Sequence, residues 1–390
     1  MLFVVPCCCG LDVHEETFEA CILKGLTEEP QVIRKEFSTL QDSLIDFANW
    51  LHANECFYVA MESTGVYWMP IYEAIETYCH YYEKIYVVNA HHYKNVPGRK
   101  SDAEDAEWLA TLLRHGLLTS SYVPDRDVRN LREASRLYKK LKSERCRYVN
   151  RAEKLLQAHG FKLSSVLSDI FCVSGRKILN FLAERGSLTQ EDVKTCLKGK
   201  TKYTAEEIHR AVAGSLNAAE RAMLSMLLQK IYRADDDLSS MLALMSDIAC
   251  PHEAQLEQID SVYGIDKLSG LLILAEVGAN PSLNFSSPER LCSWAGLSPR
   301  NDQSAGKVLS RKILPGNPYI KSILCQVAWV AVKDRKSPFG IWFWSHQARM
   351  GRKKAIIAVS CKILTTIYCI LRDGTFYNPD YELRCKKVST

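Results

Sequence analysis

The first third of the chain alternates between strand-like and helix-like segments in an order that few folds share. Three consecutive segments have the alternating apolar pattern of β-strands: Leu2–Val13, Thr17–Lys24 and Gln31–Ser38. Three strands in succession predict an antiparallel meander, whereas later strands separated by helices predict parallel neighbours, so a mixed α/β domain is expected. The segments that follow are predicted as helix, strand, helix, strand and helix, in the order Leu40–Leu51, Phe57–Met61, Tyr67–Cys79, Lys84–Asn89 and Asp102–Arg114.

The remainder of the chain is predicted to be mainly helical. After Pro124, Asp127–His159 has the spacing of one long helix, and Leu216–Met245 has that of a second, which can pack antiparallel to the first. The segment 161–214 between them has the pattern of small helices, and a third unit begins near Ile259. We therefore predict three domains: α/β at 1–120, helical coiled coil at 121–258, and mainly α-helical at 259–390.

The third unit opens on a turn that could contact phosphate. The turn Ser261–Asp266 precedes the apolar helix Leu268–Val277 and is typical of a helix-hairpin-helix element, in which a Gly-rich turn offers backbone N–H groups to a phosphate. Asp266, however, stands where a second glycine is expected, and its charge would repel phosphate. An ordinary helix start with Asp266 near its N-cap fits the same residues equally well.

Charge is distributed unevenly along the chain, although the net charge is only +5. Residues 1–120 contain 8 Lys and Arg against 18 Asp and Glu, whereas 121–160 contain 11 against 5 and 261–390 contain 19 against 8. The acidic part can bind cations and the basic parts can meet nucleic-acid phosphates, although a single charged block is usually just a solvated face.

Composition excludes several other classes of protein. There is no run of eighteen apolar residues, so no membrane span is predicted. The apolar N-terminus lacks a basic region and is interpreted as a strand rather than a signal peptide. The 15 cysteines include no Cys-x-x-Cys pair, which favours reduced thiols in a cytoplasmic protein over a disulfide framework or a zinc site.

Four carboxylates carry the main chemical hypothesis. Asp12 and Glu62 lie at the ends of strand-like runs, and Asp102 and Asp105 lie one helical turn apart at the start of a predicted helix. Carboxylate oxygens are ligands for hard cations such as Mg²⁺ or Mn²⁺, and two such ions can promote phosphoryl transfer on nucleic acid. Each acid also has a simpler interpretation. Asp12 could be an edge-strand acid facing water, and the others could be helix-start acids favoured by the dipole, beside a capping box of Ser101 and Glu104.

The long helix after Pro124 is strongly basic. An imperfect apolar stripe occupies one side, and ten cations between Arg126 and Arg151 crowd the others. This pattern predicts either contact with a nucleic-acid backbone or a solvated coiled-coil-like helix. The residues proposed for nucleic-acid contact in this helix are Arg132, Arg136, Lys139 and Lys140.

Ser304 is the candidate nucleophile. It lies in a segment rich in turn formers, predicted as a loop, which also contains Gly306. A serine hydroxyl among cations could attack a phosphodiester while the cations stabilise the developing negative charge. Serine is common in loops, so its position is weak support by itself. The flanking cations, also proposed to bind nucleic acid, are Arg300, Lys307, Arg311 and Lys312.

At this point the chain resembles a known family, the DEDD-type insertion-sequence transposases, which are relatives of the pilin-gene invertase and bridge-RNA-guided serine recombinases. Each matching piece is short, but the pieces run in family order from end to end. The N-terminal pieces are Gly10-Leu11-Asp12-Val13, Met61-Glu62-Ser63-Thr64-Gly65-Val66-Tyr67, Val88-Asn89-Ala90 and Lys100-Ser101-Asp102-Ala103-Glu104-Asp105-Ala106. The later pieces are Ser261–Gly264, Leu274-Ala275-Glu276-Val277-Gly278, Ala295-Gly296-Leu297-Ser298-Pro299, Gln303-Ser304-Ala305-Gly306-Lys307 and Gly316-Asn317.

The resemblance implies a RuvC-like (RNase H-like) first domain, a coiled-coil middle and a C-terminal transposase domain. It implies that the four acids are the catalytic tetrad that binds Mg²⁺ or Mn²⁺, and that Ser304 is the serine nucleophile. It further implies a homo-oligomer (dimer or tetramer) whose protomers share catalytic sites, with donor and target DNA and a structured noncoding guide RNA as partners. The sequence departs from the family pattern at Leu314-Pro315, where a basic pair is usual, and at Asp266.

Two other classes of function compete with this one. One is a metal-dependent nuclease of the junction-resolvase type, which uses water as nucleophile and leaves Ser304 without a role. The other is a non-catalytic nucleic-acid-binding protein whose acids only cap helices. A covalent protein–DNA adduct would separate the first two classes, and the absence of any metal-dependent activity would favour the third.

Overall fold

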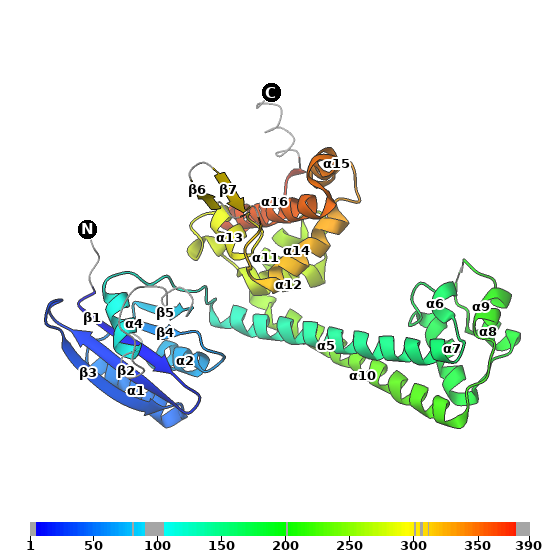
Figure 1. The fold of residues 1–390 in the computed structure, drawn as a ribbon, viewed down its shortest axis with the longest axis horizontal. Helices are drawn as coiled ribbons and strands as arrows, with labels where there is room; N and C mark the ends of the chain where they lie inside the picture. The colour runs from blue at the N-terminus through cyan, green and yellow to red at the C-terminus, as the bar shows by residue number, and fades with distance from the viewer. Residues whose placement is uncertain are drawn as a thin grey trace. The chain divides into compact units, whose positions relative to one another are not determined.

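The computed structural model describes residues 5–79, 82–89, 105–199, 202–299, 302–304, 307–310 and 312–379. The chain divides into two compact units, Met1–Val123 and Pro124–Thr390 (Figure 1). The first unit contains the acidic α/β segment, and the second contains both segments predicted as the middle and third domains. The boundary predicted between 258 and 259 falls inside a helix of this second unit, Glu253–Asp260, and the division into three domains stays a prediction.

A five-stranded mixed sheet forms the centre of the first unit. Its strands lie in the order β3-β2-β1-β4-β5, with antiparallel pairing among β1, β2 and β3 and parallel pairing of β1 with β4 and of β4 with β5. The predicted meander followed by parallel strands is therefore confirmed. The strands are β1 (Cys7–Val13), β2 (Thr17–Lys24), β3 (Gln31–Ser38), β4 (Tyr58–Glu62) and β5 (Lys84–Val88).

The first strand is shorter than predicted. The sequence pattern suggested a strand from Leu2, but β1 begins at Cys7. Pro6 precedes it and has no N–H to donate to a neighbouring strand, which explains where the described pairing begins.

Helices cover both faces of the sheet. One face packs against α1 (Gln41–Ala53) and α2 (Trp68–Tyr78), in a core that contains the Phe18, Phe37 and Phe47 rings. The other face packs against α4 (Asp105–Arg114). The sheet is thus the middle layer of three, and alternate residues of each strand face different helices.

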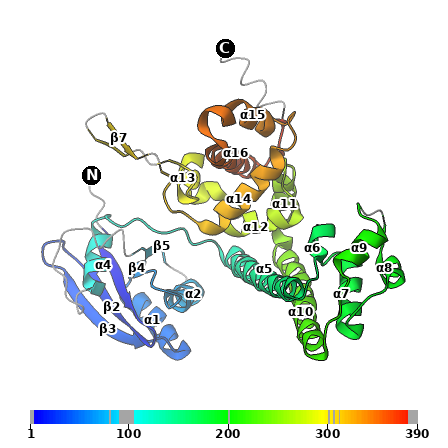
Figure 2. The ribbon, with the colours of Figure 1, turned by 45° about the vertical axis from the view of Figure 1, so that its right-hand side comes forward.

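Two long helices, α5 (Arg126–Ala158) and α10 (Ala218–Ile248), dominate the second unit. They lie side by side along their length in both views, running in opposite directions (Figures 1 and 2), so the predicted antiparallel pair is confirmed. Asp235 of α10 accepts hydrogen bonds from Arg145 of α5 and, at 2.7 Å, from Arg176. Short helices between the long ones form their own apolar core; they are α6 (Leu163–Val166), α7 (Val173–Arg185), α8 (Gln190–Cys196) and α9 (Ala205–Ala211).

The central helix of the remaining part of the second unit is α16 (Arg352–Asp373). This helix is long and apolar enough to span a membrane, but 56% of its apolar window is buried inside the protein, as in the core helix of a globular fold. The other elements of this part are η2 (Cys250–His252), α11 (Glu253–Asp260), α12 (Lys267–Val277), η3 (Pro281–Leu283), α13 (Pro288–Trp294), β6 (Asp302–Ser304), β7 (Lys307–Ser310), α14 (Pro318–Ala331) and α15 (Pro338–Met350). Of these, α11, η3, α13, α14 and α15 contact α16.

The turn between α11 and α12 is an ordinary helix start, with Asp266 at the N-cap of α12. The Asp266 carboxylate accepts a hydrogen bond from the Ser269 backbone N–H at 2.8 Å and caps α12, and this bonding lowers the pKa of Asp266. Gly264 has φ +87°, and a side chain there would meet the Val327 carbonyl and Ala331 of α14. The glycine therefore serves a turn that packs closely on a neighbouring helix.

Candidate active site

Strand alternation places Asp12 on the sheet face that α4 covers. Leu11 packs in the core on the α1 and α2 side, and Asp12 therefore points to the opposite side, with its side chain 20% exposed. The parallel register sets Leu11 beside Met61. Asp12 and Glu62, the next residue on each strand, are therefore neighbours across β1 and β4. This is the arrangement expected when two acids occupy the ends of adjacent parallel strands.

Two of the predicted acids act electrostatically on a third, Asp12. Burial raises the pKa of Asp12, and the negative charges of Asp105 and Glu62 raise it further. His14 opposes this shift, because its Nε2 lies 3.2 Å from the Asp12 carboxylate. Asp105 and Glu62 thus lie near enough to Asp12 for their charges to act on it, while Asp102 lies outside the described residues. The sequence did not indicate His14, because a single histidine two residues after Asp12 belongs to no recognisable motif.

Gly10 explains how α4 comes close to β1. A Cβ atom at Gly10 would lie 2.5 Å from the Ala110 backbone nitrogen and even nearer to the Ala106 carbonyl oxygen. Only glycine permits this approach, which carries Asp105, the residue before Ala106, toward the end of β1. The sequence shows a glycine inside a strand, which is a general sign of close backbone packing, but it does not show against which helix.

We expect Gly10→Ala to push α4 away from the sheet. The added methyl group cannot be accommodated without moving helix backbone, so the free energy of unfolding should fall by about 1–3 kcal/mol or more, measured by urea denaturation. Metal-dependent cleavage should fall more than stability alone explains. Gly25→Ala is the matched control, because its Cβ would meet nothing within 4 Å and only its φ of +91° adds strain. Equal losses of cleavage in both variants would contradict this role for Gly10.

The carboxylates suit a hard divalent cation by their chemistry. The negative charges of Asp105 and Glu62 act on the half-buried Asp12. A bound cation would relieve the repulsion between these acids. Among the described residues no group of three His, Cys, Asp or Glu side chains is close enough to hold a metal ion. The fourth acid, Asp102, is outside that set, so a complete tetrad cannot be assembled from the described residues.

Ser304 ends a strand rather than lying in a loop. β6 and β7 pair antiparallel, with Ser304 opposite Lys307 at the closed end of the hairpin. The sequence suggested a loop because Ser, Asn, Asp and Gly dominate this stretch, and strands this short leave little alternating pattern. Arg300 and Arg311 lie outside the described residues, and Lys312 is exposed beside the hairpin.

A pair of glycines fixes the base of this hairpin. Gly296 has φ +69°, and a Cβ atom there would lie 2.7 Å from the Gly316 backbone nitrogen. Just beyond the glycines, Pro299 and Ile313 form a β-bridge, and the Asn317 N–H donates to the Trp294 carbonyl at 3.1 Å. The two glycines let the segments before and after the hairpin touch, so they determine where Ser304 is held.

Comparison with known proteins assigns these two regions to one family. A family model described as "Transposase", of the DEDD type of IS110 elements, matches residues 9–160. A second model, described as "Transposase IS116/IS110/IS902 family", matches residues 256–340. The chain belongs to the IS110-type DEDD transposases. The first match contains all four predicted acids, and the second contains Ser304 with its glycine pair.

One curated relative is similar over part of its length. The Sinorhizobium fredii protein named "Putative transposase y4rJ" is 25% identical to this chain over 264 residues. The match covers 65% of this chain and 60% of that protein, so the chain spans less than two thirds of the relative.

A buried polar network lies at the centre of the second family match. The Glu276 side chain is 1% exposed, and its two carboxylate oxygens accept hydrogen bonds from Arg136 at 3.0 Å each. Asn317 donates to the same carboxylate at 2.6 Å and also caps α14 through its side-chain oxygen. Arg132 donates to the Ala275 and Glu276 carbonyls at 3.1 and 2.8 Å. The network ties α5 to α12 and α14, and its charges are compensated as buried charges require.

Three of the four cations proposed for nucleic-acid contact on α5 are therefore engaged inside the protein. Besides Arg132 and Arg136, Lys139 donates to the Tyr319 carbonyl at 3.0 Å, and burial lowers the pKa of Lys139 to about 8. Lys140 is exposed. Sequence reasoning could not separate these cations, because the acid that pairs with Arg136 lies 140 residues further along the chain.

The buried and the exposed cations of α5 can be tested separately. Replacing the exposed Lys140, Lys142 and Arg147 with Gln should weaken nucleic-acid binding and flatten its salt dependence, by a slope of about 0.9 per lost duplex phosphate contact or about 0.7 for a single strand. Arg136→Gln should instead lower the free energy of unfolding by about 3 kcal/mol, because it leaves Glu276 incompletely paired. Binding titrations at several salt concentrations would measure the first effect and urea denaturation the second. An unchanged slope in the triple variant would mean that the exposed cations are only solvated.

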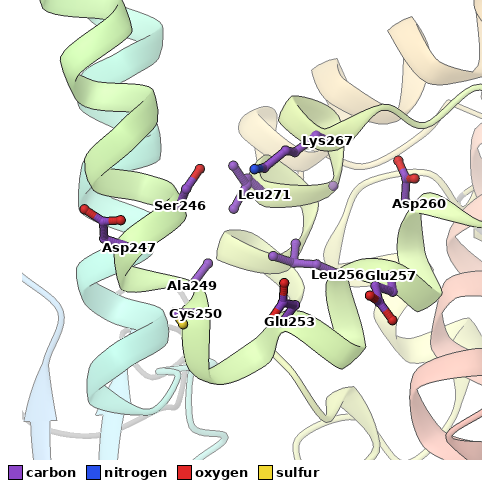
Figure 3. A pocket seen from close by; sticks show the side chains of 11 residues that line it. Ser246, Asp247, Ala249, Cys250, Glu253, Leu256, Glu257, Asp260, Lys267 and Leu271 are labelled. Carbon is purple, nitrogen blue, oxygen red and sulfur yellow. The ribbon is translucent and has the colours of Figure 1, made fainter.

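One cavity of the second unit contains no predicted site residue (Figure 3). It has a volume of about 370 Å³ and lies where the end of α10 meets η2, α11 and α12. Its floor includes Leu256 and Leu271, and four acids surround it: Asp247, Glu253, Glu257 and Asp260. The only cation in the lining is Lys267, so the net negative charge disfavours binding of a phosphate backbone in this cavity.

Proposed function

We propose that this protein is a DNA transposase that cleaves and rejoins strands, with Asp12, Glu62, Asp102 and Asp105 binding Mg²⁺ or Mn²⁺ and Ser304 acting as nucleophile. The observation that carries the proposal is the position of Asp12 and Glu62 on neighbouring parallel strands, with the charge of Asp105 acting on Asp12. The sheet order β3-β2-β1-β4-β5 supports an RNase H-like (RuvC-like) assignment for the first unit. Membership of the IS110-type family supports the reaction class.

The proposed chemistry conserves the energy of the broken bond. When bound, the divalent ion would stabilise negative charge on the scissile phosphate. The Ser304 oxygen would bond to phosphorus as the bond from phosphorus to a sugar oxygen breaks, and the proton lost by the serine balances the one gained by the released sugar hydroxyl. A second strand's hydroxyl would then displace the serine, which joins the strands and restores Ser304.

The family resemblance and the charge distribution support DNA and a noncoding RNA as partners. The basic segments of the second unit can contact donor DNA, target DNA and a structured noncoding RNA through their phosphates. The RNA would select sequences by base pairing, so the protein needs few base-specific contacts of its own. The complex would act as a homo-oligomer in the cytoplasm, where its DNA is found.

A denaturing gel tests this proposal against its rivals. Full-length protein is incubated with labelled DNA of the element's ends, the adjacent noncoding RNA and Mg²⁺, and then denatured. We expect a labelled protein–DNA adduct that protease removes and that does not form with EDTA. Efficient cleavage without an adduct would favour the water-using nuclease, and binding without cleavage under any metal would favour the non-catalytic class.

A further inference from the structure

Two thiols lie next to each other where the first strand of the sheet begins. Cys7 is the first residue of β1, and Cys56 lies two residues before β4, the parallel neighbour of β1. The register sets Cys9 beside Val59, so Cys7 and Cys56 differ by only one position along the two strands. Both side chains pack in the core that α1 and α2 cover, and a hydrogen bond joins the two thiols.

The turn before β4 is held against the start of β1 by further contacts. The Cys7 thiol donates to the Asn54 carbonyl oxygen at 3.7 Å. Lys24, which is the register partner of Cys7 on β2, donates to the same carbonyl oxygen at 3.2 Å. The Lys24 ammonium also forms an ion pair with Glu55 at 3.2 Å. These contacts position the turn, and they keep Cys56 beside Cys7.

The neighbours of Cys7 favour its ionised form. The hydrogen bond from Cys56 is the main reason that the pKa of Cys7 is lowered, and it outweighs the opposing effect of burial. The positive charges of Lys24 and Arg114 lower this pKa further, while the charge of Glu55 opposes them. Arg114 is buried, and within the described ranges two of its guanidinium nitrogens have no hydrogen-bond partner. A partly exposed thiolate beside a second thiol is the arrangement that oxidants attack most readily.

The adjacent cysteines are protected by burial. Burial raises the pKa of Cys8 to about 12 and that of Cys21 to about 11. It also holds the pKa of Cys9 well above the usual value. Each of these thiols therefore stays neutral and unreactive near neutral pH. Within the run of three consecutive cysteines, only Cys7 combines access to solvent with a lowered pKa.

We propose that Cys7 is a peroxide-sensitive thiol and that Cys56 is its resolving partner, so that oxidation joins β1 to the turn before β4 through a disulfide. The Cys7 sulfur attacks the O–O bond of hydrogen peroxide, which leaves a sulfenic acid on Cys7 and releases one water. The Cys56 sulfur then attacks the Cys7 sulfur, so the S–S bond forms as the S–O bond breaks and a second water leaves. The two thiols lose two electrons and two protons, and the peroxide is reduced to two waters.

The modification lies outside the candidate active site. Cys7 and Cys56 are at the opposite end of β1 and β4 from Asp12 and Glu62. Formation of the disulfide needs neither a metal ion nor nucleic acid, so the proposal stands independently of the proposed function.

Peptide mass spectrometry tests the proposal on the full-length protein. Reduced wild type is treated with hydrogen peroxide, alkylated and digested, and we expect two peptides joined through Cys7 and Cys56 that dithiothreitol separates. Cys56→Ser should instead keep Cys7 as a sulfenic acid that dimedone traps, because the resolving thiol is gone. Cys7→Ser should leave Cys56 reduced. Cys146→Ser, which removes an exposed thiol of α5, is the matched control and should form the same disulfide as wild type.

A pH series tests the role of the thiolate. The rate at which iodoacetamide alkylates Cys7 should rise with pH through a midpoint below that of an ordinary cysteine. Lys24→Gln should move this midpoint to higher pH, because a positive charge beside the thiolate is lost. Lys35→Gln, the same change at an exposed position of β3, should leave the midpoint unchanged.

Four outcomes would overturn the proposal. They are a disulfide in wild type that does not include Cys7, oxidation of Cys56 that persists in Cys7→Ser, a Cys56→Ser protein in which dimedone does not label Cys7, and an alkylation midpoint for Cys7 no lower than that of an ordinary cysteine. None of these measurements involves DNA cleavage, so a failure here is distinct from a failure of the proposed function.

Discussion

Replacing Asp105 with Asn should reduce Mg²⁺-dependent strand cleavage by about 100- to 1,000-fold or more, while the protein stays folded. The substitution removes one negative charge and keeps the side-chain shape, so α4 should keep its packing on β1. Asp12→Asn should have the same effect. Cleavage would be measured with labelled DNA at saturating Mg²⁺, and folding by urea denaturation.

Glu107→Gln is the matched control for Asp105→Asn. Glu107 lies on the same first turn of α4 but pairs with Arg34 of β3. Its removal should leave cleavage within a fewfold of wild type. The Asp105 variant should also lower the pKa of Asp12 in the metal-free protein, because one of the charges that raises it is gone. Carboxyl NMR would record this shift. Near-normal cleavage in Asp105→Asn would contradict the assignment of these acids as metal ligands.

Replacing Ser304 with Ala should abolish both recombination and the covalent protein–DNA adduct, and leave DNA binding intact. Without the hydroxyl no bond to phosphorus can form, so the loss should be complete. Ser304→Cys should retain traces of adduct, because a thiolate is also a nucleophile. Ser310→Ala is the control, since Ser310 pairs with Asp302 at the open end of the same hairpin. Denaturing electrophoresis and a DNA-binding assay would be run on all four proteins.

The contrary outcome for Ser304 is equally clear. An adduct of unchanged yield in Ser304→Ala would assign the attack to another side chain. Cleavage that persists in Ser304→Ala without any adduct in wild type would transfer the role of nucleophile to water.

Local patterns in the sequence predicted most of the first unit. The strands β2 and β3 begin and end where the sequence pattern placed them. The two long helices were also predicted, since a 3.6-residue period sustained over about thirty positions is typical only of a helix. The fate of Arg136 was not predicted, because its partner Glu276 is brought near only by the tertiary fold. The hairpin that carries Ser304 was missed for a different reason, because strands of three and four residues are too short to show a period.

For the predicted acids, the sequence identified the residues but not the packing that positions them. Strand ends identified Asp12 and Glu62, and spacing identified Asp105, but only the missing side chain at Gly10 shows what draws the helix and the strand together. Likewise Gly296 and Gly316 were noticed as family pieces, and their contact across the base of the hairpin required three-dimensional coordinates.

The Glu276 carboxylate has a mechanical consequence. On one side it holds Arg136 of α5, and on the other it holds Asn317, which directly follows the glycine at the hairpin base. Glu276 therefore couples the basic helix to the base of the hairpin that contains Ser304, alongside the backbone contacts of Arg132 and Lys139. A substitution at Glu276 should accordingly reduce the activity proposed for Ser304 without changing any residue of the hairpin.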